Sequence, residues 1–344
     1  MSERPLVAVT MGDPAGVGPE VALKALAEPE VHELCRPVVF GSAAVMAREA
    51  QALGREVEIV TDSPLERDDA SPARVVVLET ASREAVEAPR GEVSPAGGEA
   101  AVSAVRAATE LALAGRVHAL ATGPLNKESM RSAGYDWAGH TELLADLCGV
   151  DEVSMLLIGK RLRVAHVTTH VAMERVPGLV TDVRLRSVAR IAHEAVRRLG
   201  IDAPRIGVAG LNPHAGEGGM FGDEEQRVVA PAIAALREDG LDIAGPVAGD
   251  AVFIDMDRRF DIVVVMYHDQ GHIPIKLLER DDAVNVTGGL PIVRTSVDHG
   301  TAFDIAGQGI ASDSSMVAAL RMAALLADPG YSGGRRSSSS ASAA

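Results

Sequence analysis

Three histidines of the sequence directly follow apolar, β-branched runs. His170 follows RVAHVTT, His214 follows RIGVAGLNP and His268 follows DIVVVMY. In an open α/β sheet, the carboxyl ends of the strands form the edge where ligands bind. Three neutral imidazoles at such an edge suit a catalytic zinc or a similar divalent ion. The alternative is that each histidine is a hydrogen-bonded loop residue, and the residues alone leave both interpretations open.

One of these histidines has a second histidine four positions later, the spacing of the HExxH zinc helix. His268 and His272 belong to the stretch VVVMYHDQGHIPIKLL. Gly271 and Pro274 lie where that helix would run, and the preceding VVVM is rich in β-branched residues. We predict a buried strand that ends at Tyr267 and is followed by a turn, so that the two histidines need not act together.

Two further histidines lie four positions from members of this set. His166 lies four positions before His170, within an apolar run, and we predict a hydrogen-bonded core residue. His272 is either a further ligand or a residue that supports the ligands.

A glycine-rich loop follows the first apolar run. MGDPAGVGPE comes after LVAVT and before the helix-like VALKALAE, an order typical of loops that cradle phosphates with backbone N–H groups. The spacing of Gly12, Gly16 and Gly18 matches neither GxGxxG nor GxxxxGK[ST]. The alternative is a set of tight-turn glycines without a ligand, with Asp13 and Glu20 as solvent-facing caps.

Polar and basic residues in apolar surroundings form another group. Lys276 in IPIKLL and Arg294 in LPIVRTS flank strand-like runs and could hold an anion, because a cation among apolar residues is costly unless paired. Solvated charges at a sheet edge are the alternative. Lys127 in TGPLNKE is a further candidate anion contact. The glycine-rich VDHGTAFDIAGQGIA is compatible with a nucleotide loop and equally with a simple connection.

The elements that carry these residues alternate along the chain. Apolar runs such as PVVFGS, RVVVLE and DIVVVMYH alternate with helical patterns such as EAAVSAVRAATELALAG, which end in glycine. This alternation predicts an α/β protein with a largely parallel sheet that is buried on both faces. A chain of 344 residues can form two moderate cores, so we expect two domains. The last residues, GYSGGRRSSSSASAA, predict a disordered tail.

Composition excludes several classes of partner. The net charge of −15 argues against nucleic acid or an anionic membrane as the main partner. Cys35 and Cys148 are too few for a disulfide framework. No apolar run approaches the roughly 20 residues of a membrane span, and the N-terminus lacks the features of a signal peptide. We expect a cytoplasmic protein.

Taken together, the motifs resemble the 4-hydroxythreonine-4-phosphate dehydrogenase (PdxA-like) family over residues 4–327. They are MGDPAGVGPE, TGPLNK, GHTELL, TTH, GLNPHAGEGG, MYHDQG and GLPIVRTSVDHGTAFDIAG. The last is also similar to the nucleotide loop of isopropylmalate dehydrogenases. The resemblance implies a homodimer of two-domain α/β/α subunits, isocitrate/isopropylmalate dehydrogenase-like and not a Rossmann fold. We expect one domain at residues 1–130 plus 275–328, a second at 131–274, and a disordered tail at 329–344.

The resemblance also implies a role for each candidate residue. The metal ligands, in a site shared across the dimer, would be His170, His214 and His268, which with Lys276 form the catalytic set. The substrate contacts would be His140, Thr141, Lys276, Asn285, Arg294 and Asp250. The contacts to NAD or NADP would be His299, Gly300, Thr301, Asp304, Gly12 and Asp13. The divalent metal would be Zn, Mg or Co.

The implied reaction is a metal-dependent, NAD-linked oxidative decarboxylation. The substrate would be 4-hydroxythreonine 4-phosphate, which yields 3-amino-2-oxopropyl phosphate for pyridoxal phosphate synthesis. The spellings PLNKE, GHTELLA and YHDQGHIPIKLL look closer to the branch that oxidises D-threonate or D-erythronate 4-phosphate to dihydroxyacetone phosphate. His140, Asn285 and Arg294 argue against a third branch, whose dihydrodiol substrate lacks phosphate. A non-catalytic nucleotide- or metal-binding regulator would lack a complete set of ligands.

Overall fold

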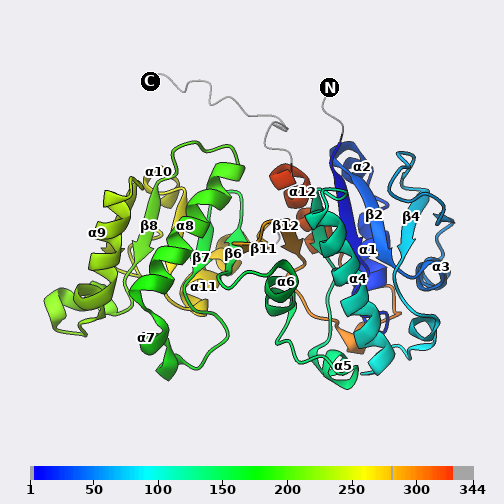
Figure 1. Cartoon of the computed structure of the whole chain (residues 1–344), viewed down its shortest axis with the longest axis horizontal. Coiled ribbons are helices and arrows are strands. Elements are labelled where there is room, and N and C mark those ends of the chain that lie inside the picture. The colour runs from blue at the N-terminus through cyan, green and yellow to red at the C-terminus, as the bar shows by residue number, and fades with distance from the viewer. Residues whose placement is uncertain (1–3, 280–281, 328–344) are drawn as a thin grey trace.

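The computed structural model describes residues 4–279 and 282–327, and within them one 12-stranded sheet runs through the molecule (Figure 1). The strand order is β3-β4-β2-β1-β5-β12-β11-β6-β7-β10-β8-β9. The strands are β1 (Leu6–Thr10), β2 (Arg36–Gly41), β3 (Glu58–Val60), β4 (Arg74–Glu79), β5 (Ala119–Thr122), β6 (Ser154–Ile158), β7 (Arg163–His166), β8 (Ile206–Ala209), β9 (Ile243–Val247), β10 (Ile262–Val265), β11 (Val284–Gly288) and β12 (Val293–Ser296).

Helices flank the sheet. The α-helices are α1 (Gly18–Ala25), α2 (Pro29–Leu34), α3 (Ala43–Ala52), α4 (Pro95–Leu113), α5 (Lys127–Ser132), α6 (His140–Cys148), α7 (Val176–Leu179), α8 (Asp182–Arg198), α9 (Ala230–Glu238), α10 (Met256–Arg259), α11 (His268–Leu278) and α12 (Ser314–Ala327). Shorter or wider turns are η1 (Arg83–Glu87), η2 (Met173–Arg175), η3 (Pro213–Gly219), η4 (Glu225–Val229) and η5 (Phe303–Ile305). No helix of the described part is long and apolar enough to cross a membrane.

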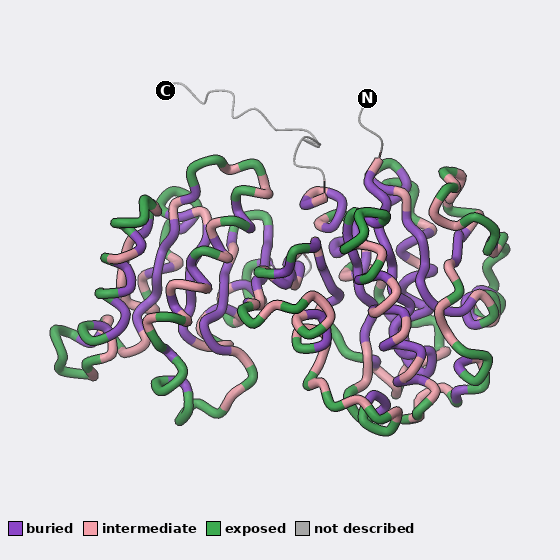
Figure 2. Tube along the Cα trace, in the orientation of Figure 1, coloured by how far each residue is buried: buried purple, intermediate pink, exposed green. Residues whose placement is uncertain are grey.

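Four strands within the two halves of the sheet are buried along their whole length. β1, β5, β8 and β10 show no exposed or half-buried residue, and in Figure 2 the buried strands run between more exposed helices. A strand covered on both faces must be apolar at every position rather than at alternate ones. The predicted α/β protein with a largely parallel sheet is therefore confirmed.

The sheet contains two parallel sets that run in opposite directions. β3, β4, β2, β1, β5 and β12 are mutually parallel, as are β7, β10, β8 and β9, and three antiparallel pairings through β11 and β6 join the sets. This central reversal separates the sheet from the Rossmann arrangement. Residues that follow the carboxyl ends of β5 and β12 in one set and of β7 in the other nevertheless border a common cavity.

The hairpin of β11 and β12 joins the two sets with residues from late in the chain. β12 pairs with β5, and β11 pairs with β6. The division into domains at residues 1–130 plus 275–328 and 131–274 stays a prediction, since one sheet runs through both. The predicted disordered tail, residues 329–344, lies outside the described residues.

The prediction of a turn after Tyr267 is wrong, because α11 begins at His268 and continues to Leu278. Pro274 removes only the hydrogen bond that its own N–H would give to the Gln270 carbonyl. Gly271 serves close packing: a Cβ there would lie 2.7 Å from His166 Nε2. The buried Ile275 fixes the helix on the sheet, so tertiary packing outweighs the local preference of glycine and proline.

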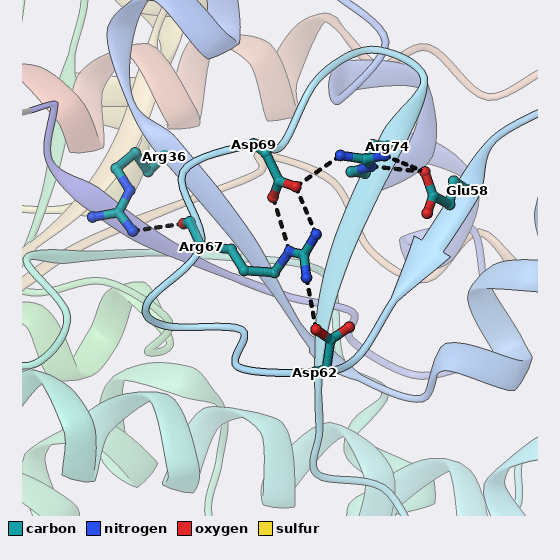
Figure 3. A network of polar contacts seen from close by, with 6 residues as sticks. All are labelled: Arg36, Glu58, Asp62, Arg67, Asp69 and Arg74. Carbon is teal, nitrogen blue, oxygen red and sulfur yellow. Dashed lines mark hydrogen bonds and ion pairs between the residues drawn. The ribbon is translucent and has the colours of Figure 1, made fainter.

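β3 is the first strand in the order of the sheet, and ion pairs cross-link the charged loop between β3 and β4 (Figure 3). Arg67 bridges Asp62 and Asp69, at 2.7 and 2.6 Å, and Arg74 bridges Asp69 and Glu58, both at 2.7 Å. These pairs cross-link the loop to itself and to β3. Exposed pairs of this kind each contribute little stability.

Candidate functional site

A cavity of about 650 Å³ opens where the two parallel sets meet. Its lining includes residues that follow the carboxyl ends of β5, β7 and β12, together with the start of α6. This volume is typical of small-molecule sites. The cavity brings together seven residues that the sequence had singled out: Lys127, His140, Thr141, His170, Asn285, Arg294 and His299.

Arg294 is buried in this cavity wall as an uncompensated cation. Its side chain is 3% exposed and donates to the hydroxyls of Thr122, at 2.7 and 3.1 Å, and of Thr287, at 2.9 Å. In the described part of the chain, no carboxylate forms an ion pair with it. Burial lowers the pKa of Arg294 to about 9, so the guanidinium stays charged at neutral pH. A buried cation without a counter-charge favours an anionic ligand.

The start of α6 adds further features suited to an anion. His140 and Thr141 are the first residues of this nine-residue helix, and both line the cavity. Unpaired backbone N–H groups of a helix N-terminus attract negative charge. His140 Nε2 is buried without a hydrogen-bond partner among the described residues. Burial and then the charge of Arg294 lower the pKa of His140 well below its usual value, so this imidazole is neutral.

A chain of hydrogen bonds fixes the tautomers of the histidines beside the cavity. His166 Nδ1 donates to the Met155 carbonyl at 2.9 Å, so its Nε2 accepts from His272 Nδ1 at 3.2 Å. His272 Nδ1 also lies 3.0 Å from the His268 carbonyl, which requires the same proton on Nδ1. His268 Nδ1 donates to the Asp269 carboxylate at 2.7 Å. The Nε2 atoms of His268 and His272 are therefore left with free lone pairs.

The fully buried His166 makes the protein sensitive to acid. Burial lowers its pKa to about 3, whereas an ordinary histidine titrates near 6.5. Between these values the unfolded chain binds a proton that the folded protein does not, so stability falls as pH decreases from 6.5 toward 3. This one group contributes up to about 1.4 kcal/mol per pH unit. We expect the urea midpoint of the wild type to fall across this range and that of His166→Gln to fall less steeply; equal slopes would contradict the assignment.

Two of the three predicted metal ligands lie together. The rings of His170 and His268 are 5.4 Å apart between centroids, and both residues line a second cavity of about 310 Å³. His170 borders both cavities, so the histidine pair adjoins the anion-binding wall. Within the described residues of one chain, no group of three or more His, Cys, Asp or Glu side chains could hold a metal ion. His214 is thus not assembled with the other two in a single chain.

His214 lies on a strained turn after β8. It is exposed, 6.2 Å from the Phe221 ring between centroids. Residues 214–218 all adopt left-handed backbone angles, with φ between +42° and +82°. His214, Ala215 and Glu217 are not glycines, and each such residue costs about 1–2 kcal/mol in this conformation. Neighbouring groups must therefore hold the turn, as is common at functional sites.

Lys276 and Asp250 lie away from the lining of the main cavity. Lys276 lies on α11 rather than beside a strand and forms a short ion pair with Asp298, which precedes the predicted cofactor segment. This pair links α11 to the end of β12. Asp250 is exposed in the loop after β9.

The predicted cofactor segment packs against the glycine-rich loop. The buried Thr301 accepts at its carbonyl from Val17 N at 2.9 Å, and His299, Gly300 and Asp304 are exposed. Gly12 is buried against Pro124, where a Cβ would lie 2.4 Å from the carbonyl oxygen. The two loops therefore form one packed unit.

The alternative in which Asp13 and Glu20 are solvent-facing caps is wrong, since they are 0% and 1% exposed. Asp13 Oδ1 accepts from Ala15 N at 3.0 Å, and burial raises its pKa. Glu20 Oε1 accepts from Lys24 Nζ at 2.7 Å and Ala311 N at 2.8 Å, which ties the end of the second glycine-rich segment to α1. Both buried carboxylates therefore hold the loops in place by accepting hydrogen bonds from backbone N–H groups.

Sequence reasoning missed several residues that support the site. Thr122 and Thr287 hold Arg294, and Asp298 holds Lys276. Threonine next to glycine in HALATGP and VNVTGG was a signal of a polar residue at a strand end, but nothing local connects it to Arg294.

Comparison with known proteins finds related sequences over most of the chain. The family model described as pyridoxal phosphate biosynthetic protein PdxA matches residues 33–323. The chain is 48% identical to 4-hydroxythreonine-4-phosphate dehydrogenase of Geobacter metallireducens, over 96% of this chain and 98% of the relative. It is 45% identical to D-threonate 4-phosphate dehydrogenase of Salmonella typhimurium, over 94% and 100%.

Solved structures agree with this. The crystal structure of 4-hydroxythreonine-4-phosphate dehydrogenase from Klebsiella pneumoniae superposes with a TM-score of 0.88 at 44% identity, covering 94% of this chain and 98% of that one. The predicted resemblance is therefore confirmed over nearly the whole described chain.

Proposed function

The chain belongs to the PdxA family, and from this premise we propose that it catalyses the metal-dependent, NAD-linked oxidative decarboxylation of a 4-phosphorylated 3-hydroxy acid. The observation that carries the proposal is Arg294, a buried cation in the cavity wall that has no carboxylate partner among residues 4–279 and 282–327. A substrate with both a phosphate and a carboxylate supplies the missing negative charge. The favoured substrate is 4-hydroxythreonine 4-phosphate, with 3-amino-2-oxopropyl phosphate as product.

The anion-binding groups would orient the substrate. Arg294 and the N–H groups at the start of α6 would hold one anionic group, and Asn285 on β11 would contact the substrate beside it. The neutral imidazole of His140 can donate or accept a hydrogen bond without adding charge to the site. Contacts to the anionic groups of the substrate, which are remote from the reacting carbon, then fix the position of that carbon. Such positioning raises the reaction rate.

The histidines fit a divalent metal. Donation of His268 Nδ1–H to Asp269 leaves Nε2 free, the carboxylate–histidine arrangement common around metal ligands. We propose His170, His214 and His268 as ligands in a site shared across a homodimer, with Zn, Mg or Co bound. The exposed His214, apart from the other two in one chain, is consistent with a contribution to a partner's site.

The reaction divides between the cofactors and the chain. When bound, the metal would acidify the C3 hydroxyl and NAD or NADP would accept the hydride from C3. The β-keto acid then loses carbon dioxide from C1 and takes up a proton at C2. Lys276 lies outside the cavity lining, but its partner Asp298 stands between the lining residues Val297 and His299, so the pair would place a positive charge beside the cavity and near the departing carboxylate. The His299–Asp304 segment and the Gly12–Asp13 loop would bind the nicotinamide cofactor.

The second candidate substrate is D-threonate or D-erythronate 4-phosphate, which yields dihydroxyacetone phosphate. Relatives named for the two reactions are nearly equally similar to this chain, at 48% and 45% identity. The substrates share the C3 hydroxyl, C1 carboxylate and C4 phosphate and differ only at C2, so both satisfy Arg294.

The test is NAD reduction, followed by absorbance, with metal-loaded enzyme and the competing substrates side by side. We expect reduction with at least one phosphorylated hydroxy acid and its loss on chelation. Preference for the amino acid assigns the enzyme to pyridoxal phosphate synthesis, and preference for the sugar acids assigns it to their breakdown. No reduction with any of them would overturn the proposal and favour a non-catalytic binding protein.

A further inference from the structure

The left-handed turn that carries His214 encloses a buried carboxylate. Glu225, the first residue of η4, is 3% exposed. Its Oε1 accepts from Asn212 N at 2.7 Å, and its Oε2 accepts from Asn212 Nδ2 at 2.9 Å. The same carboxylate thus binds the main chain and the side chain of the residue two positions before His214.

Glycines allow the loop to approach this carboxylate closely. A Cβ at Gly210 would lie 3.3 Å from Glu225 Oε1, and a Cβ at Gly216 would lie 2.8 Å from Oε2. Gly216 also has φ +82°, where a side chain is disfavoured. The turn is therefore wrapped around Glu225, whose position decides the path of residues 212–216.

A second side chain ties the same loop to the helix of His268. Gln270 on α11 donates from Nε2 to the Gly210 carbonyl at 2.8 Å, and its Oε1 accepts from Met266 N at 2.7 Å. Gln270 lies two positions after His268. The start of the His214 loop thus has a fixed position relative to α11, while Glu225 sets the direction in which the loop continues.

We propose that Glu225 is a positioning residue of the metal site: through Asn212, it holds the left-handed turn that presents His214. This inference rests on the proposed function, because it assumes that His214 binds metal. Among the described residues, the buried Glu225 carboxylate bonds to Asn212 rather than to His214, and Glu225 lines neither candidate cavity. It acts by preorganising a ligand whose backbone would otherwise leave the left-handed region.

The test is a Co²⁺ titration of the metal-free, full-length protein, followed by the visible absorption of bound Co²⁺. Glu225→Gln keeps the volume and one acceptor for Asn212 N, but its amide N–H₂ faces the Asn212 Nδ2 donor. We expect the Kd for Co²⁺ to rise about 10- to 100-fold, as is usual when a group that orients a metal ligand is lost. Glu224→Gln is the matched control, because the Glu224 carboxylate accepts from the Asn212 side chain, at 2.8 Å, whereas the Asn212 main-chain N–H donates to Glu225. This control variant should change Kd less than threefold.

Further variants separate the outcomes. If Glu225→Gln does not fold, Gly216→Ala tests the same idea, since its Cβ displaces the turn from the carboxylate without removing the charge. Wild-type Co²⁺ affinity and spectrum in a folded Glu225→Gln or Gly216→Ala variant would overturn the positioning role. Loss of the Co²⁺ spectrum in His214→Ala supports the ligand set. Retention of that spectrum in His214→Ala would overturn the metal assignment in the proposed function and, with it, this inference.

Discussion

Replacing Arg294 with methionine is expected to lower kcat/KM by about 30- to 5,000-fold while leaving the folded protein as stable as the wild type or more so. The activity loss follows from removing the partner of a buried substrate anion, which costs about 2–5 kcal/mol. The effect on stability has the opposite sign because the cation is 3% exposed and has no carboxylate partner in the described chain. Replacing a buried charge with an apolar side chain of similar volume is often neutral or stabilising.

The matched control for this variant is Arg184→Met, at another arginine in the cavity lining. Arg184 is fully partnered: it donates to the Val167 and Val153 carbonyls and pairs with Glu152 at 2.6 Å. Its loss should lower the melting temperature and change kcat/KM by less than tenfold. The paired measurements are steady-state kinetics and thermal unfolding. Wild-type kcat/KM in Arg294→Met would show that the substrate anion binds elsewhere.

Replacing His214 with alanine should lower turnover by about 10³-fold and leave the fold intact. A loss of this size corresponds to the several kcal/mol by which a catalytic metal stabilises the transition state. The fold should survive because His214 is exposed and its only ring contact among the described residues is with Phe221. The substitution does not relieve the backbone strain at this position, because alanine is as disfavoured as histidine at φ +51°.

Activity, metal content and circular dichroism together check this second prediction. Met220→Ala is the control, because Met220 lies in the same loop and is 73% exposed. It should retain activity and bound metal. Near-normal turnover of His214→Ala would remove His214 from the ligand set, and the tautomer argument for His268 would then stand alone.

Parts of this architecture could be predicted from local sequence alone. A strand buried on both faces needs a continuous apolar run, so β1, β4 and β10 were recognisable, and α8 shows the spacing of an amphipathic helix. The placement of His170, His214 and His268 after parallel neighbouring strands also followed from those runs. Such signals depend only on residues close together in the chain.

What could not be predicted depends on contacts distant in the sequence. From its local sequence Gly271 is expected to break a helix, because its packing against His166, 105 positions earlier, leaves no local signal. Arg294 reads equally well as a surface charge, because its burial depends on Thr122, 172 positions earlier. The left-handed turn at His214 is held by Glu225 from a following element, and no local pattern in NPHAGEGG specifies that partner.

The late hairpin that joins the two parallel sets also has a consequence for biosynthesis. β5 completes its pairing only with β12, and their residues Thr122 and Thr295 are 173 positions apart. A ribosome adds about 5–20 residues per second, so roughly 9–35 s separate the emergence of the two strands. During that time the earlier strands can pair with one another, but the outer edge of β5 exposes unpaired backbone groups. Until its own C-terminal hairpin has been synthesised, each nascent chain therefore presents an edge of β5 with which strands of other chains can pair.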